Sequence, residues 1–175
     1  AIAAARGVPV FEAMHSPHHR LFAEIMQIVG SGVLGRIMRI DAVFDAPIDP
    51  EDPIRWQAAL GGGALMDLGI YPLAWVRRIA GENFELGSVE AEMRGVVDAS
   101  FAAELKYPDG ATARVSSSMT VEAPAVSLRI EGAEGVLSVV NPLVPQRGNL
   151  LTLEVGGGSE SRTAEGPSSY AAQLA

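Results

Sequence analysis

The sequence has no cysteine and a single lysine, Lys106, among its 175 residues. Without cysteine the chain can form neither a disulfide framework nor a thiolate metal site, which fits the cytoplasm, where we expect this protein to reside. No charged segment followed by a short apolar one marks a signal peptide, and no uninterrupted apolar run approaches the ~20 residues of a membrane span.

Basic residues are few relative to acidic ones, 13 against 21, and the formal net charge is −8. A balance this acidic argues against binding to nucleic acid or to an anionic membrane. Apolar residues make up 48% of the chain, enough for the core of one domain. The mean hydropathy of +0.21 is typical of a chain that covers part of its surface with a partner or a further domain.

Hydrophobic periodicity changes along the chain from helical to extended. It predicts helices over 17–29 and 63–79, the second with Leu65, Leu68, Leu73 and Val76 in the core, and a strand over 36–44 followed by a loop over 46–60. Later strands are expected over 89–96, 101–107, 111–119, 126–130, 136–140 and 150–155. Successive hairpins build antiparallel sheets, so we predict an α+β fold with a mostly antiparallel open sheet and helices on one face. The segment 156–161 is expected to be a mobile turn.

Both ends of the chain have the pattern of interrupted elements. Residues 1–5 favour a helix too short to be stable alone, and residues 8–13 have the pattern of a short buried strand. Near the other end, Ser168 can cap a helix that stops within two turns. We therefore expect residues 1–14 to be the remnant of a preceding domain, and residues 15–175 to be a second domain that is truncated before its last helix.

A glycine motif at Gly30-Ser31-Gly32-Val33-Leu34-Gly35 matches G-x-G-x-x-G, the dinucleotide-binding pattern. That pattern binds a pyrophosphate only between a strand and the start of a helix. Here a helix precedes the motif and a strand follows it. The glycines are therefore interpreted as a helix C-cap and a turn, not as a cofactor site.

The segment Gly61–Tyr71 is the most informative, because three glycines open a helix that carries Asp67 and Tyr71 four residues apart. This spacing places a carboxylate and a phenol on one helix face, as in the wall of a proton-transferring pocket. A phenol with a pKa near ~10 needs a nearby ammonium group to act as a base. The alternative is a half-buried tyrosine beside a carboxylate that caps local amides, and spacing alone favours it.

Other polar residues allow two interpretations each. Arg55 can bind an anionic or hydroxylated substrate, or it can pair at the surface with Glu51 or Asp52. Trp56 can stack on a sugar ring or cover the edge of the core.

Three histidines, His15, His18 and His19, lie close together in the sequence. No acidic residue accompanies them at a metal-ligand spacing, and adjacent histidines rarely bind one ion together. We expect them in a turn that enters a helix, and we predict no metal site.

An ordered set of segments resembles the glucose–fructose oxidoreductase/inositol dehydrogenase/MocA family, nearest to its dihydrodiol/xylose dehydrogenase branch. Residues 61–71, with Ile54-Arg55-Trp56 before them, resemble the signature helix of that family. Further resemblances, in the family's order, are Phe11-Glu12-Ala13, residues 32–37, Asp98, residues 107–110, residues 131–135 and residues 170–174.

The resemblance implies an NAD(P)-dependent oxidoreductase that oxidises or reduces a hydroxyl or carbonyl group of a sugar, polyol or diol. In the family, an N-terminal Rossmann domain binds NAD or NADP, and a catalytic lysine lies in an upstream Lys-Pro motif. This chain lacks both, so residues 1–14 resemble the end of the Rossmann domain and the fragment alone is expected to be inactive and not to bind the cofactor tightly. The residues implied are Tyr71 and Asp67 in catalysis, Arg55, Trp56 and His19 at the substrate, and Glu12 at the cofactor. At His19 the match is imperfect, because Arg20 stands where the family has proline.

Two other functions remain open from the sequence. The chain can be a binding module that keeps the family fold without its chemistry, or a domain for dimers and higher oligomers. For the second, an exposed apolar sheet face is expected, formed by Phe101, Ala103, Leu105 and Tyr107 paired with Ala111, Ala113, Val115 and Met119.

Overall fold

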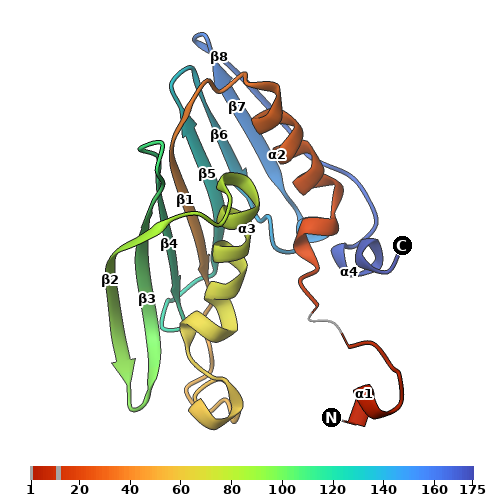
Figure 1. The fold of residues 1–175 in the computed structure, drawn as a ribbon, viewed down its shortest axis with the longest axis vertical. Helices are drawn as coiled ribbons and strands as arrows, with labels where there is room; N and C mark the ends of the chain where they lie inside the picture. The colour runs from red at the N-terminus through yellow and green to blue at the C-terminus, as the bar shows by residue number, and fades with distance from the viewer. Residues whose placement is uncertain (1, 11–12) are drawn as a thin grey trace.

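Alternating strand patterns and two amphipathic helices build one open sheet with helices packed on one face, as the computed structural model shows (Figure 1). The structure describes residues 2–10 and 13–175. The helices are α1 (Ile2–Ala5), α2 (Arg20–Ser31), α3 (Ile70–Ala80) and α4 (Ser169–Gln173), with short turns η1 (Ser16–His18), η2 (Ala58–Leu60), η3 (Leu65–Gly69) and η4 (Pro145–Arg147). The strands are β1 (Ile37–Asp45), β2 (Glu85–Arg94), β3 (Val97–Lys106), β4 (Thr112–Ser118), β5 (Ala125–Gly132), β6 (Gly135–Val140), β7 (Leu150–Val155) and β8 (Gly158–Arg162).

β1 lies in the middle of the sheet although it is the first strand in the chain. The strand order is β2-β3-β4-β1-β5-β6-β7-β8. β1 pairs parallel with β4, with Arg39 opposite Thr112, and antiparallel with β5, with Asp41 opposite Arg129. The other neighbouring strands are antiparallel. The predicted α+β fold with a mostly antiparallel open sheet is confirmed.

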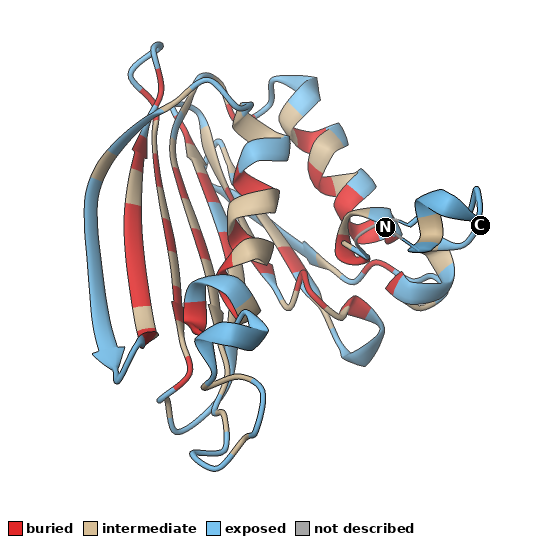
Figure 2. Ribbon diagram, turned by 60° about the horizontal axis from the view of Figure 1, so that its bottom comes forward, coloured by how far each residue is buried: buried red, intermediate tan, exposed pale blue. Residues whose placement is uncertain are grey.

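The core lies between the sheet and the two long helices. α2 and α3 cover the same face of the sheet, and their buried sides turn toward it, whereas the edge strand β2 is exposed along its length (Figure 2). Leu21 and Ile25 of α2, Trp75 of α3, and Ile40 and Leu128 of the sheet are all at most 1% exposed. The apolar side of each amphipathic helix therefore meets the apolar side of the central strands.

The apolar face of β3 and β4 is covered, and the expectation that it is exposed was wrong. All eight residues of that face are buried, because they lie on the side of the sheet that the helices cover. The helix-free face carries instead the alternate residues of the central strands, among them Arg39, Asp41, Arg114 and Ser116. The exposed side of the sheet is therefore polar and charged.

The glycine motif at residues 30–35 ends a helix, as expected. α2 runs to Ser31, and Gly32 follows with φ +76° as the left-handed C-cap, its amide donating to Val29 O. β1 begins two residues after Gly35. In the described part of the chain these amides follow the C-terminus of α2 and precede β1, so the motif does not have the strand-to-helix geometry of a dinucleotide site.

Three local predictions differ from the structure. Residues 8–10 and 13, expected in a strand with residues 11 and 12, are not in one, because none of the described strands pairs with them; residues 11 and 12 themselves lie outside the described residues. Residues 156–161 were expected to be a mobile turn, but from Gly158 onward they belong to β8, which pairs with β7. Leu65 is 40% exposed rather than in the core, because it begins the turn before α3.

One helical stretch, Ala58–Ala80, is long and apolar enough by length and composition alone to cross a membrane. The prediction from the sequence concerned uninterrupted apolar runs, and this stretch contains Asp67, Arg77 and Arg78, so it does not contradict that prediction. In the structure this stretch is interrupted near Gly61 and Gly63, where φ is positive, and Ala64, Leu68, Trp75 and Val76 are buried in the core.

Candidate active site

The helix that carries Asp67 and Tyr71 begins against the loop before it. The amide of Gly63 donates to Arg55 O at 2.9 Å, and Gly63 has φ +111°. A Cβ at this position would collide with the carboxylate of Asp98, whose Oδ2 accepts a hydrogen bond from the amide of Leu65 at 2.7 Å. Asp98 thus caps the start of the helix from β3, and only glycine fits beside it.

Asp67 lies in a single π-helical turn, Leu65–Gly69, that leads into α3. The amide of Ile70 closes this turn on Leu65 O. Gly69 lies where a Cβ would overlap the ring of Phe101, so the wide turn packs directly on β3. π-turns are rare and occur often at functional sites. This one places Asp67 and, in the first turn of α3, Tyr71 at the same cavity.

The cavity has a volume of about 300 Å³ and lies between the helical turn, the end of β1 and the C-terminal segment. Its polar groups include Arg55, Asp67 and Tyr71, which the sequence had placed together. The remaining lining residues are His15, Phe44, Ala46, Ile48, Leu68, Leu143 and Tyr170. Polar groups that converge in a hollow beside apolar side chains are the usual form of a small-molecule site.

Arg55 joins two carboxylates at the rim of this cavity. Its Nε donates to Asp67 Oδ2 at 2.9 Å and its Nη1 donates to Asp52 Oδ2 at 3.0 Å. The charge of Asp67 and the hydrogen bond to Asp52 raise the pKa of the Arg55 guanidinium above its ordinary value. The expected pairing of Arg55 with Asp52 is therefore present, and Arg55 also lines the cavity.

Aromatic rings form the opposite wall. The ring of His15 stacks on Tyr170 with centroids 4.0 Å apart and lies 5.9 Å from the ring of Tyr71. Tyr71 also packs edge-on against Phe44, at 5.8 Å. Tyr71 is thus half-buried, as the alternative interpretation proposed, and it also lines the cavity.

Trp56 and His19, expected at the substrate, lie outside this cavity. Trp56 donates to Asp49 O at 2.8 Å and is stacked under the guanidinium of Arg94 at 4.3 Å. His19 is 1% exposed, and its Nδ1 accepts from the amide of Leu21, which makes it the N-cap of α2. Glu12, expected at the cofactor, lies outside the described residues.

His15 and Tyr170 were not identified as site residues from the sequence. They are more than 150 residues apart, and no local pattern reports that η1 and α4 lie side by side. Within residues 2–10 and 13–175, no group of three His, Asp or Glu side chains is arranged to hold a metal ion.

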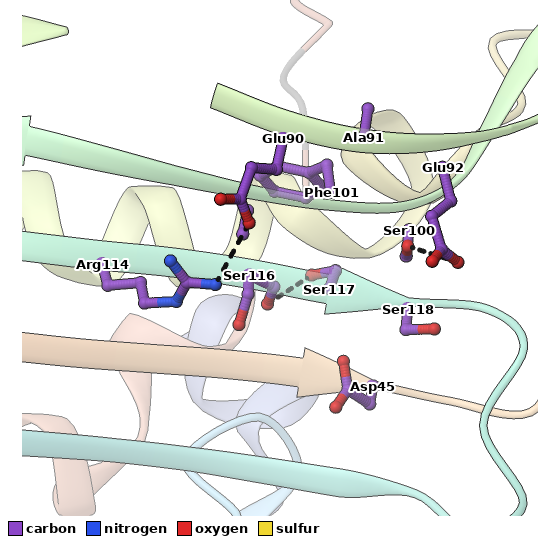
Figure 3. A pocket seen from close by; sticks show the side chains of 11 residues that line it. Asp45, Glu90, Ala91, Glu92, Ser100, Phe101, Arg114, Ser116, Ser117 and Ser118 are labelled. Carbon is purple, nitrogen blue, oxygen red and sulfur yellow. Dashed lines mark hydrogen bonds and ion pairs between the residues drawn. The ribbon is translucent and has the colours of Figure 1, made fainter. Parts of the chain in front are cut away.

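A second hollow lies on the helix-free face of the sheet (Figure 3). The hydroxyls of Ser100, Ser116 and Ser118 lie there, with Asp45 and Arg114 beside them (Figure 3). Burial raises the pKa of Asp45, while a hydrogen bond from the backbone of Ser118 opposes that rise. This hollow is polar and shallow, and it shares no residue with the cavity that holds Asp67 and Tyr71.

Comparison with curated proteins gives several relatives. The dTDP-3,4-didehydro-2,6-dideoxy-alpha-D-glucose 3-reductase of Streptomyces violaceoruber is 31% identical over 167 residues, 92% of this chain and 48% of that protein. D-xylose 1-dehydrogenase (NADP(+)) 2 of Haloferax volcanii is 32% identical over 114 residues, 64% of this chain and 35% of that protein. The chain therefore spans about half the length, or less, of the curated relatives it matches.

Similar folds occur among solved structures. A 3-ketoreductase from Actinomadura kijaniata, in complex with NADP and TDP-benzene, matches with a TM-score of 0.87 at 24% identity, over 99% of this chain and 54% of that one. The aldose-aldose oxidoreductase of Caulobacter crescentus, complexed with glycerol, matches with a TM-score of 0.86 at 25% identity, over 99% of this chain and 54% of that one.

The family comparison covers more than half of the chain. Residues 22–138 match the GFO/IDH/MocA C-terminal domain, and this segment contains the π-turn, α3 and the five strands from β1 to β5. The chain therefore belongs to the GFO/IDH/MocA family.

Proposed function

We propose that this chain supplies the substrate pocket of an NAD(P)-dependent oxidoreductase that interconverts a hydroxyl and a carbonyl group on a sugar, polyol or diol. The observation that carries the proposal is the convergence of Asp67, Tyr71 and Arg55 on one cavity. The names of the relatives support it, since they include a sugar-nucleotide reductase and a xylose dehydrogenase.

The nicotinamide cofactor would accept or supply the hydride. Among the described residues, the single G-x-G-x-x-G segment caps a helix C-terminus and does not have the strand-to-helix arrangement that this motif needs to bind a dinucleotide. The proposal therefore assigns cofactor binding to a preceding domain, of which residues 1–14 are the end, and substrate binding to residues 15–175.

Within the pocket, Tyr71 is the proton-transferring group and Asp67 orients either the reacting hydroxyl or a lysine from the preceding domain. Proton transfer must accompany hydride transfer, because the hydroxyl oxygen loses its proton as the carbonyl forms. Arg55 fixes the Asp67 carboxylate through its 2.9 Å hydrogen bond. Lys106, the only lysine of the chain, ends β3 and does not line the cavity.

We further infer that the helix-free sheet face serves oligomerisation. Arg39 donates to Asp41, and Arg129 pairs with Glu131, on adjacent central strands of this face. Alternating charges of this kind favour a charge-complementary partner such as a second copy. Sedimentation of the full-length protein tests this inference, and the double change Arg39→Glu and Arg129→Glu is expected to produce monomers. A monomeric wild type would overturn it.

The test of the enzymatic proposal is turnover by the full-length protein with NADP(H) and NAD(H) against D-xylose, D-glucose and trans-diols. Tyr71→Phe is expected to lower kcat by about 10²- to 10⁴-fold, as for loss of a general acid or base. Tyr107→Phe is the matched control, because Tyr107 lies at the end of the sheet near Gly81. Wild-type turnover that Tyr71→Phe leaves unchanged would contradict the assignment.

A further inference from the structure

His15 is held in place by a chain of hydrogen bonds that begins at buried residues and ends at the exposed residue Gln146. Its Nδ1 lies 2.8 Å from Ser169 Oγ, and Ser169 is fully buried at 0% exposure. The hydroxyl and the amide of Ser169 both donate to Gln146 Oε1, at 3.3 and 3.2 Å. His15 directly precedes η1, Ser169 begins α4 and Gln146 lies in η4, so the chain of bonds joins distant parts of the sequence.

The hydrogen bonds select one tautomer of the His15 ring. The two bonds to Gln146 fix Oε1 as the acceptor, and the Ser169 hydroxyl has only one proton to give. If that proton goes to Gln146, Ser169 Oγ must accept from His15 Nδ1–H, and every bond is made. If His15 instead carries its proton on Nε2, the Ser169–Gln146 hydroxyl bond is lost. The Nδ1–H form therefore makes one hydrogen bond more than the Nε2–H form and is favoured.

The second ring nitrogen of His15, Nε2, takes no part in this chain of bonds. His15 lines the cavity with Tyr71 and Tyr170, and its Nδ1 edge is turned toward Ser169. Stacking on Tyr170 at 4.0 Å keeps the ring plane fixed. No hydrogen bond within residues 2–10 and 13–175 uses His15 Nε2, and burial lowers the pKa of His15, which favours the neutral ring with a lone pair on Nε2.

We propose that Gln146 and Ser169 hold His15 as the Nδ1–H tautomer and that His15 Nε2 accepts a hydrogen bond from a hydroxyl group of the substrate. The identity of the donor, a sugar or polyol hydroxyl, rests on the function proposed above. The tautomer does not rest on it, because the protein alone determines the hydrogen bonds that select it.

The tautomer is tested first, by long-range ¹H–¹⁵N NMR of the histidine rings in the full-length protein. His15 is expected as the Nδ1–H form. His19 is an internal control with the opposite expectation, because its Nδ1 accepts from the amide of Leu21 and its proton must be on Nε2. Ser169→Ala is expected to shift His15 toward the Nε2–H form and to leave His19 unchanged. A wild-type His15 in the Nε2–H form would overturn the proposal.

The substrate contact is tested with two amide variants of opposite geometry. In His15→Gln, the side-chain amide reaches the position that Nε2 of the His15 ring occupies. In His15→Asn, the shorter side chain reaches only the position of Nδ1. With D-xylose or D-glucose as the probe, we expect His15→Asn to raise KM about five- to tenfold, as for loss of a neutral hydrogen bond, and His15→Gln to stay within about threefold of the wild type. Equal KM values for His15→Asn and the wild type would overturn the contact.

The two proposals fail in distinguishable ways. If the wild type turns over no sugar or diol, the proposed function fails, and the tautomer measurement still decides the Gln146–Ser169–His15 chain. Addition of the same sugars should then leave the His15 Nε2 resonance unshifted, which would overturn the substrate contact as well. If turnover is present, that resonance shifts on adding sugar to the wild type, and KM rises in His15→Asn but not in His15→Gln, both proposals are supported.

Discussion

At the scale of single residues, three neighbouring histidines have three different environments. His15 forms a cavity wall, His18 is exposed, and His19 is buried as the cap of α2. Desolvation lowers the pKa of both buried rings, and for His19 the charge of Glu24 partly opposes it. The protonated forms of His15 and His19 are therefore disfavoured in the folded state.

Stability is expected to fall on acidification because of these two histidines. Below the ordinary pKa of 6.5, these histidines bind protons in the unfolded chain but remain neutral in the folded chain. The free energy of unfolding is therefore highest above pH 6.5, and it decreases as the pH falls toward the lowered pKa of the folded state. Thermal unfolding followed from pH 8 to pH 5 measures the loss. His18→Asn should keep this pH dependence and His19→Asn should weaken it; an equal dependence in both variants would contradict the assignment.

Replacement of Arg55 should separate stability from activity. Arg55→Lys keeps the charge but cannot donate to Asp52 and Asp67 with the same fork of nitrogens. Because the Arg55 side chain is 42% exposed, the free energy of unfolding should change by less than about 1 kcal/mol. We expect kcat/KM to fall by about tenfold, since Asp67 loses its fixed orientation. Asp52→Asn is the control, and an equal activity loss there would contradict a specific role for the Asp67 bond.

At the scale of elements, the start of the π-turn depends on Gly63. Gly63→Ala introduces a strained φ of +111° and a collision with Asp98, and should cost about 2–3 kcal/mol of unfolding free energy. Gly61→Ala is a matched control, because φ there is +76° but nothing lies within 4 Å of the added Cβ. In chemical denaturation, the free energy of unfolding of Gly63→Ala should be well below that of Gly61→Ala. Equal losses would show that the Asp98 contact is unimportant.

Elements with a strong local pattern were predictable from the sequence. α2 has alternating apolar and polar sides and a glycine cap, and the hairpin of β3 and β4 has a Pro-Asp-Gly turn at 108–110, so both were located within a few residues. β8 was missed because glycine and serine give no strand pattern, and its pairing with β7 supplies the order that the sequence does not show. The π-turn was also missed, because its extra residue is fixed by packing of Gly69 on Phe101.

The candidate site was predictable in the part that is local in sequence. Asp67 and Tyr71 lie four residues apart in one helical segment, and Arg55 lies in the loop just before it. Residues this close in the sequence can be predicted to lie near one another. His15 and Tyr170 meet only through the packing of η1 against α4, which no local pattern reports. His19 was assigned to the substrate by resemblance, yet burial and its cap to Leu21 give it a different position.

At the scale of the whole molecule, the two faces of the sheet have opposite character. The face under α2 and α3 is apolar and closed, and the other carries serines and alternating charges (Figures 2 and 3). The sequence alone misplaced these faces, because alternation along a strand tells which residues share a side but not which side the helices cover.

The central position of β1 has a consequence for the order in which the chain folds. β2–β4 and β5–β8 are meanders with short connections, whereas β1 must reach partners about 70 to 90 residues away to join them. Closing loops of that length is slow, so insertion of β1 should be the rate-limiting event. In stopped-flow refolding we expect Ile40→Val in β1 chiefly to slow folding and Leu151→Val in β7 chiefly to speed unfolding. During synthesis on the ribosome, β1 would then remain unpaired until β4 and β5 have been synthesised.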